Sequence, residues 1–232
     1  MKLQRKIQPP IRQVKLKDIP EASRETLNNG IPLYILNSGD EDILRIDLLF
    51  DGGQIRETLP LVASTTNMML LEGSENYNAN EINSAFDFYG AFVNPFTQKD
   101  ISGISVFLLN KHLRNIGELC QEIVFRPLFP EKELEQLQEK RLQTFLMNRK
   151  RVQNLASDKF YESIFGTDHP YGRQVMENDF NNVRNNNLVE FHHKSYEVGP
   201  VAIIVSGKVK NQTTEVINNF FGRNKTGIIR NE

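Results

Sequence analysis

Two pairs of strand-like segments, separated by helical sequence, most constrain what this chain can fold into. Residues 33–36 and 43–50 flank a turn-forming cluster, and apolar and polar residues alternate in the second segment, as in a half-buried strand. Residues 91–96 and 101–109 repeat the arrangement around a four-residue polar turn. The pattern predicts two β-hairpins.

Helical periodicity fills most of the remaining chain, and one further β-branched strand is expected near the C-terminus. Asn78 followed by Glu81 is typical of a capping box at a helix start. Hairpins segregated from helices predict an α+β fold, with a mainly antiparallel sheet of about five or six strands packed against helices. The asparagine-rich stretch 178–187 is expected to be a solvated loop. The predicted helices span 60–72, 78–89, 111–126, 131–151, 155–165, 188–196 and 213–221, and the last strand spans 201–205.

Composition excludes several classes of partner. The 232 residues carry a net charge of -1, so there is no electrostatic case for a nucleic-acid partner. No apolar run is long enough for a membrane span, and residues 1–22 look like an irregular polar arm rather than a secretory signal. We therefore expect a soluble, cytoplasmic protein.

Few residues could build a metal or nucleophilic site. The single cysteine, Cys120, lies on the apolar face of its predicted helix and is expected to be buried and unreactive. His192 and His193 are adjacent, so on a helix they point apart and are expected to form a solvated pair rather than a metal site. The loop 166–173 contains His169 among turn-forming residues, and either a structural turn or a functional loop is consistent with it.

Six short segments stand in order along residues 23–222: 26–33, 50–57, 71–74, 94–97, 168–173 and 204–209. Two of them read Leu71-Glu72-Gly73-Ser74 and Asp168-His169-Pro170-Tyr171-Gly172-Arg173. Together the six resemble motifs of the insulinase/pitrilysin metallopeptidases, the inverzincins. The first of these two is similar to the sequence that closes the metal-binding helix of that family, and the second is similar to its His-Pro-Tyr-Gly-Arg loop. The resemblance implies that family's α+β domain.

The resemblance also implies a zinc site that this chain lacks. Active members carry His-x-x-Glu-His on the helix before the glycine, where two His bind Zn²⁺ and the Glu activates water. Counting from Gly73, those positions hold Ser64, Asn67 and Met68, and no histidine occurs between residues 1 and 111. The third ligand position falls near Phe145, and the nearest acidic residue is Glu139. None of the residues at the matching positions suits Zn²⁺, so the expected cofactor of the family is predicted to be lost.

The family contains ligand-free subunits that pair with zinc-bearing homologues around a peptide. The resemblance therefore implies a non-catalytic domain whose partners are a homologous zinc-bearing peptidase subunit and a peptide substrate. In the family a peptide is added to an edge strand, and the matching residues here are Ala91, Phe92, Val93 and Asn94. Pro95 would interrupt such pairing or protect the edge.

Two alternatives stay open at this point. One is a scaffold or binding module with no proteolytic context. The other is an enzyme with a relocated site near His169, Asp168 and Tyr171. We also expect residues 23–222 to form the domain and residues 223–232 to begin an interdomain linker, as in a fragment of a two-domain subunit.

Overall fold

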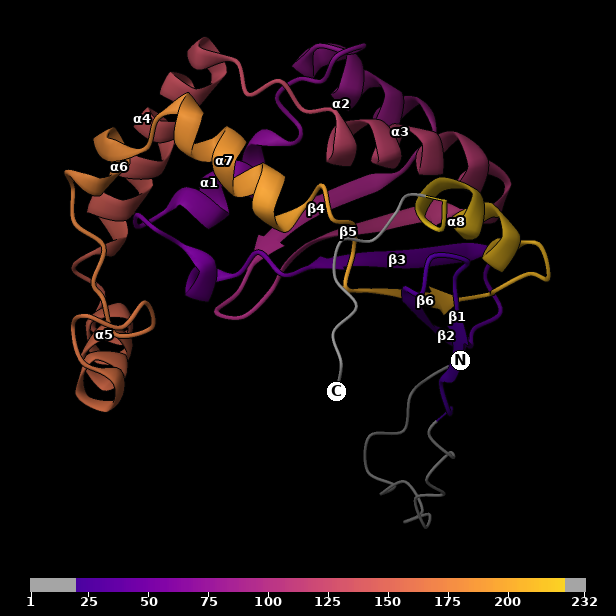
Figure 1. Cartoon of the computed structure of the whole chain (residues 1–232), viewed down its shortest axis with the longest axis horizontal. Helices are drawn as coiled ribbons and strands as arrows, with labels where there is room; N and C mark the ends of the chain where they lie inside the picture. Colours follow the sequence, from indigo (N-terminus) through magenta and orange to yellow (C-terminus); the bar gives the residue numbers. More distant parts are fainter. Residues whose placement is uncertain (1–19, 224–232) are drawn as a thin grey trace, which may run out of the picture.

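One six-stranded sheet organises the computed structural model, which describes residues 20–223 (Figure 1). The strand order across the sheet is β1-β2-β6-β3-β5-β4, and only the β2–β6 pair is parallel. The predicted α+β class with a mainly antiparallel sheet is therefore confirmed. The strands are β1 (Ser23–Thr26), β2 (Pro32–Asn37), β3 (Ile43–Phe50), β4 (Phe92–Thr97), β5 (Ser102–Leu109) and β6 (Ala202–Gly207).

The predicted hairpin over residues 33–50 is wrong, although both of its strands exist. β6 lies between β2 and β3, with Ile46 opposite Val205, so the two strands are not neighbours. Val205 is fully buried there, and an apolar β-branched strand is best accommodated between two others. β1 was not predicted because all four of its residues are exposed and none is apolar.

The second hairpin is confirmed. β4 and β5 pair antiparallel, with Val93 opposite Val106, and β4 forms one edge of the sheet. All but residues 20–22 of the predicted arm 1–22, and all but residue 223 of the predicted linker 223–232, lie outside the described residues.

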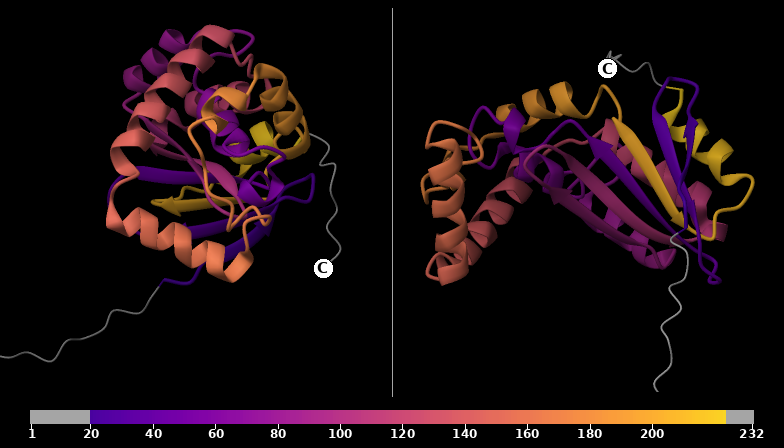
Figure 2. Two further views of the ribbon diagram at one scale, coloured as in Figure 1. Left: turned by 90° about the vertical axis from the view of Figure 1, so that its left-hand side faces the viewer. Right: turned by 90° about the horizontal axis from the view of Figure 1, so that it is seen from below.

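The helices α1, α2, α3, α7 and α8 cover one face of the sheet (Figures 1 and 2). The predicted loop over 178–187 is wrong, because it contains the short α6 and the start of α7. Within residues 20–223, no helix combines the length and the apolar character that crossing a bilayer needs. The helices are α1 (Val62–Met69), α2 (Ala79–Phe88), α3 (Leu113–Phe125), α4 (Glu131–Asn148), α5 (Val152–Phe165), α6 (Asp179–Asn182), α7 (Asn185–Ser195) and α8 (Thr213–Phe221).

Local signals set the ends of α2 as predicted. The Asn78 side chain accepts a hydrogen bond of 3.1 Å from the Glu81 N–H, and the Glu81 carboxylate accepts one of 2.8 Å from the Asn78 N–H. Two N–H groups that the helix leaves unpaired are thereby satisfied. Gly90 follows the helix with a φ of 60°, a left-handed conformation that glycine adopts without strain.

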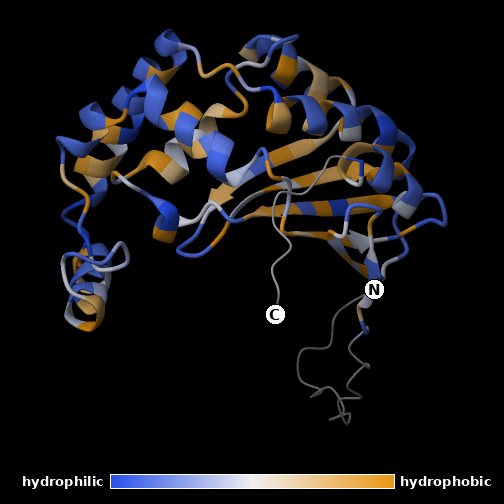
Figure 3. Cartoon of the chain, viewed as in Figure 1, coloured by the Kyte–Doolittle hydropathy of each residue, from blue (hydrophilic) through white to orange (hydrophobic). Residues whose placement is uncertain are grey.

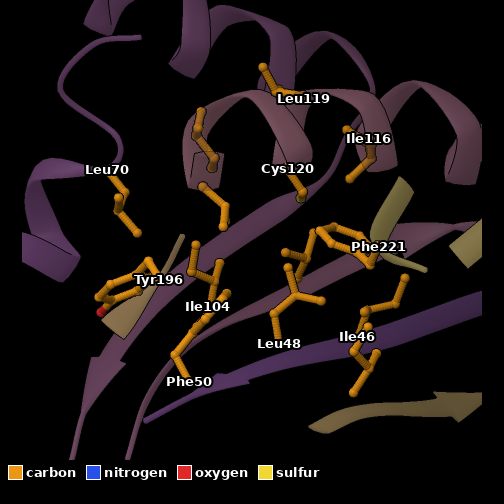
Figure 4. Packing of buried hydrophobic residues seen from close by; sticks show 14 of the residues in the cluster. Ile46, Leu48, Phe50, Leu70, Ile104, Ile116, Leu119, Cys120, Tyr196 and Phe221 are labelled. Atoms are coloured by element: carbon orange, nitrogen blue, oxygen red, sulfur yellow. The ribbon is translucent and has the colours of Figure 1, made fainter. Parts of the chain in front are cut away.

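The core lies between the sheet and the helices of that one face (Figure 4). The ring centroids of Phe50 and Tyr196 are 4.7 Å apart, and the Tyr196 hydroxyl is 2.7 Å from Ser102 Oγ, so the one polar atom of this buried tyrosine is paired. Cys120 packs in the same core as predicted, and burial raises the pKa of its thiol to about 12. In Figure 3 apolar residues line the strands, while polar residues dominate the outer helix surfaces.

The second half of α4 and all of α5 extend away from the sheet as an arm (Figures 1 and 2). α5 has no buried residue, in contrast to α3.

The core predicts that truncating Leu48 will be costly. Leu48 lies on the central strand β3 with 1% of its surface exposed, so Leu48→Ala should lower the free energy of unfolding by about 2–5 kcal/mol through lost burial and a new cavity. Urea unfolding measures this change. Leu128→Ala is the matched control, because Leu128 is 54% exposed and should cost little. Equal losses for the two variants would contradict the packing described here.

Candidate functional site

A cavity of about 440 Å³ lies where the arm meets the body of the domain. Its walls come from the start of α1, the end of α4, the first part of α5 and the loop that contains Tyr171. Ser64 and Phe145 both line it, so the tertiary structure brings together two of the four positions that the family resemblance singled out.

Another cavity, of about 520 Å³, lies between α2 and α3. Its buried carboxylate, Glu122, is already satisfied, since it accepts hydrogen bonds of 3.1 and 2.9 Å from the backbone and side chain of Asn76. The smaller cavity is the better candidate because Ser64 and Phe145, two of the positions that the family resemblance singles out, both line it.

Arg141 of α4 lies beside Ser64 of α1. Its guanidinium donates a hydrogen bond of 2.7 Å to Ser64 Oγ and a second one to Thr65 Oγ1. Burial lowers the pKa of this arginine, while the nearby Glu57 raises it. Arg141 precedes Phe145 by one turn of α4, so α4 presents a cation and an aromatic ring to α1.

The other two positions on α1 point elsewhere. Asn67 is buried against the sheet, where its Nδ2 donates hydrogen bonds of 2.7 Å to the Phe96 carbonyl and 3.0 Å to the Gly103 carbonyl. Met68 is 41% exposed and does not line the cavity. Of these three α1 positions, Ser64 alone lines the cavity.

The donor set of this region does not suit Zn²⁺. Phe145 packs against Phe180 with ring centroids 5.3 Å apart and offers no metal ligand, and Glu139 is exposed on α4. Within residues 20–223 there is no group of three or more His, Cys, Asp or Glu side chains that could hold a metal ion. Hydroxyl, amide and thioether groups at the α1 positions are poor zinc ligands.

Glu57 is the buried acid of the site. Its Oε1 accepts a hydrogen bond of 3.1 Å from the Ala63 N–H at the start of α1, and its Oε2 is 3.5 Å from Arg173 Nη2. Burial raises the pKa of Glu57 to about 7, against the opposing effects of the Ala63 N–H and of Arg173.

Sequence reasoning assigned no role to Glu57, Arg141 or Arg173. Glu57 and Arg173 fall inside two of the motif segments, which is the one signal that could have singled them out. Arg141 lies in a charge-rich helix, where nothing in the sequence distinguishes a half-buried arginine from its exposed neighbours.

The four residues predicted to bind a peptide, 91–94, lie at the start of the edge strand β4. Ala91 is buried just before β4, Phe92 is 74% exposed, and Asn94 is also exposed. Among the described strands, β4 pairs with β5 alone. β4 is therefore an edge strand with Pro95 inside it, and peptide binding at residues 91–94 stays a prediction.

His169 and His192 fill structural positions. His169 stacks on Phe165 at 5.2 Å between ring centroids, and its Nδ1 accepts a 3.1 Å hydrogen bond from the Tyr171 N–H. The predicted solvated pair is wrong for His192, which is 4% exposed and bonded through Nε2 to the Val124 carbonyl at 2.7 Å. His193 is exposed beside Glu197, because helical neighbours face different directions.

Comparison with known proteins decides the family. The family described as Insulinase (Peptidase family M16) matches residues 36–179, which is more than half of the chain. This chain belongs to the insulinase family. The resemblance inferred from the short motifs is thereby confirmed.

The insulinase-family chain spans about half the length of several relatives that it matches. It is 22% identical over 203 residues to the uncharacterized zinc protease YmxG of Bacillus subtilis, covering 86% of this chain and 49% of YmxG. The fold is similar to the inactive domain of a peptidase M16 from Pseudomonas fluorescens, with a TM-score of 0.76 and 22% identity over 87% of this chain and 51% of that one. A protease from Helicobacter pylori gives a TM-score of 0.76 at 18% identity, over 92% of this chain and 53% of that one.

Glu57 should make stability depend on pH. A carboxyl group with a folded pKa of about 7 and an ordinary unfolded value of 4.5 holds its proton longer when folded, so stability falls as pH rises between these values. The loss attributable to Glu57 between pH 4.5 and pH 8 is about 3 kcal/mol. Glu57→Gln should remove that slope, and urea unfolding across this pH range measures it.

Glu139→Gln is the control for this experiment, because it removes an exposed carboxylate from the same region. Burial lowers the pKa of His192 and gives a slope of opposite sign, which is common to all three proteins and cancels in the comparison. If Glu57→Gln and Glu139→Gln keep the slope of the unaltered protein, the buried acid described here is contradicted.

Proposed function

We propose that this insulinase-family chain is a non-catalytic domain that pairs with a homologous, zinc-bearing subunit and helps to enclose a peptide. The observation that carries the proposal is the Arg141 guanidinium, bonded to Ser64 at the position that the family resemblance assigns to the first metal ligand. The Arg141 guanidinium therefore lies beside the position at which the resemblance would place a metal-binding imidazole.

The electrostatics of this arrangement oppose a metal. Two unit charges about 4 Å apart interact by about 4 kcal/mol at an effective dielectric constant of 20, so a divalent cation beside a guanidinium would be destabilised by about 8 kcal/mol. Glu57 offsets part of the Arg141 charge, but it is already bonded to Ala63 and Arg173. The site therefore favours Arg141 over Zn²⁺.

The surroundings of Asn67 also oppose a general base. The family resemblance matches Asn67 to the glutamate that activates water in active members. In this chain the Asn67 amide donates hydrogen bonds to two backbone carbonyl oxygens. A carboxylate at the same place would face those oxygens without a donor and would be repelled. This local chemistry supports a non-catalytic role.

The β4 edge supports the peptide part of the proposal. An extended peptide can add to a free strand edge through its backbone, and Phe92 offers an exposed apolar contact there. The proposal includes the cytoplasmic location expected from the sequence. A homologous subunit with intact His-x-x-Glu-His would supply the chemistry of hydrolysis.

Co-expression with such a subunit tests the proposal. We expect the full chain alone to hydrolyse no peptide and to bind less than about 0.1 equivalent of zinc. Mixed with a zinc-bearing insulinase-family subunit encoded in the same genome, it should form a stable complex and raise that subunit's kcat/KM for a fluorogenic peptide at least about tenfold. Size-exclusion chromatography, metal analysis and the peptide assay measure these three quantities.

The control complex carries glutamine in place of the glutamate in the partner's His-x-x-Glu-His. It should form normally and show no hydrolysis. Metal-dependent hydrolysis by the full chain without any partner would show that the active site lies in this chain and would overturn the proposal.

A further inference from the structure

The position of α5 depends on very few contacts. Among the α-helices of residues 20–223, α5 alone has no buried residue. The preceding helix α4 has one, Leu134, which lies near its N-terminus and therefore far from α5. Figure 2 shows α5 apart from the sheet at one end of the molecule. A segment with so little buried surface is held in place only weakly, and single side-chain contacts decide where it lies.

The loop after α5 packs on α5 itself. The Phe165 ring at the end of the helix lies 5.2 Å between centroids from both the His169 ring and the Tyr171 ring, and these two rings are 4.8 Å apart. Such ring clusters hold side chains in fixed relative orientations. Helix and loop, residues 152–174, therefore form one unit, which we call the lid.

The lid supplies part of the wall of the 440 Å³ cavity. Leu155, Tyr161 and Tyr171 line the cavity from the lid, while Glu57 and Ser64 line it from the body of the domain. Any movement of the lid away from the body would therefore open the cavity to solvent on one side.

The turn between β4 and β5 holds the lid at two neighbouring residues. Lys99 Nζ lies 3.6 Å from the centroid of the Tyr161 ring and donates a 3.4 Å hydrogen bond to the Tyr171 carbonyl. The next residue, Asp100, accepts a hydrogen bond from the Tyr171 hydroxyl. Asp158 of the lid favours the charged form of Lys99, as Asp100 does. We call these contacts the latch.

The turn that carries the latch is fixed to the body through its backbone. The Gln98 carbonyl accepts a 3.0 Å hydrogen bond from the Gln54 N–H, and the Lys99 carbonyl accepts one of 2.9 Å from the Ile55 N–H. Across the turn, the Gln98 N–H donates a 2.8 Å bond to the Ile101 carbonyl. None of these bonds involves a side chain of the latch. The latch therefore joins a weakly held lid to a rigid support.

The chain has two segments about which the lid can turn. Residues 149–151 precede the lid and residues 175–178 follow it, and neither segment contains a buried residue. An ion pair of 2.7 Å between Arg149 and Glu177 joins the two segments. They therefore lie side by side and define one hinge.

One further contact of the lid lies beside this hinge. Arg173 Nη2 is 3.5 Å from Glu57 Oε2 of the body, and Arg173 precedes the second hinge segment by two positions. A contact close to the hinge changes least when the lid turns. The latch, at the β4–β5 turn, is therefore the contact that must break first.

We propose that residues 152–174 are a lid on the cavity, which the β4–β5 turn latches in the observed position and which opens as a unit about residues 149–151 and 175–178. The lid goes beyond the proposed function and does not depend on it, because every residue involved belongs to this chain.

Spin-label distances in the full chain at pH 8 test the inference. Cys120 is 4% exposed, so nitroxide labels will attach to introduced cysteines alone. Ser163→Cys on the lid and Glu118→Cys on α3 are both at exposed positions and report the distance between lid and body. Double electron–electron resonance should give one dominant distance when the latch is intact.

Lys99→Gln combined with Tyr171→Phe removes the latch. Loss of the cation–π contact and of the hydroxyl hydrogen bond should raise the population outside the dominant distance at least about fivefold. An unchanged distance distribution would overturn the proposal. Tyr171→Phe alone keeps the ring cluster and should raise that population about twofold or more, so it replaces the double variant if the latter does not fold.

Lys111→Gln combined with Tyr77→Phe is the matched control. It removes the same charge and the same hydroxyl group from the body, where Lys111 is exposed and Tyr77 is 43% exposed. The distance distribution should stay that of the unaltered protein. An equal change in the control and in the latch variant would contradict the latch.

A second label pair separates opening of the lid from fraying of α5. Gln153→Cys and Asp168→Cys lie at exposed positions at the two ends of the lid. Their distance should stay the same when the latch is removed, because the lid turns as a unit. If this distance broadens as much as the distance between lid and body, α5 unfolds locally and the proposed lid is wrong.

Discussion

The pairing of β6 with both β2 and β3 is the contact on which the rest of the domain depends. Residues 202–207 join the sheet about 150 positions after β3, and Ile203 and Val205 are fully buried there. Without that strand, β2 and β1 would have no link to β3, β5 and β4. The insertion also draws α7 across the core, so that Tyr196 packs on Phe50. Contacts so distant in sequence are costly to close, and they are formed only when the whole apolar face is buried together.

Two of the α1 positions that the family resemblance assigns to the metal site, Ser64 and Asn67, form hydrogen bonds within the domain. α1 is attached to the sheet through the amide of Asn67 and to α4 through the hydroxyls of Ser64 and Thr65. These bonds pair the Asn67 Nδ2 donor and the hydroxyls of Ser64 and Thr65, which would be costly to leave unpaired. Among the described residues the buried Asn67 Oδ1 has no hydrogen-bond partner. Ser64 and Asn67 are poor zinc ligands, but both form hydrogen bonds that hold α1 in place. The stability of α1 is thereby linked to the proposed non-catalytic role.

The arm and the strand edge are the two features of the domain that leave surface available. The arm formed by α4 and α5 stands away from the sheet (Figure 2). A cavity of about 440 Å³ lies where this arm meets the body, and both cations and acids line it. Among the described strands β4 pairs with β5 alone, and a free strand edge can add an extended segment through its backbone.

The amino-acid sequence by itself determined the elements whose signals are local. The capping box of α2, the hairpin β4–β5 and the burial of Cys120 all follow from residues a few positions apart, because helix and strand periodicity act over that range. The family motifs are local too, and they led correctly to the insulinase fold. Only the tertiary structure decided that β6 separates β2 from β3, that His192 is buried, and that Arg141 meets Ser64. Each of these joins segments at least 68 positions apart, and periodicity in a short window carries no information about which distant segment a residue will meet.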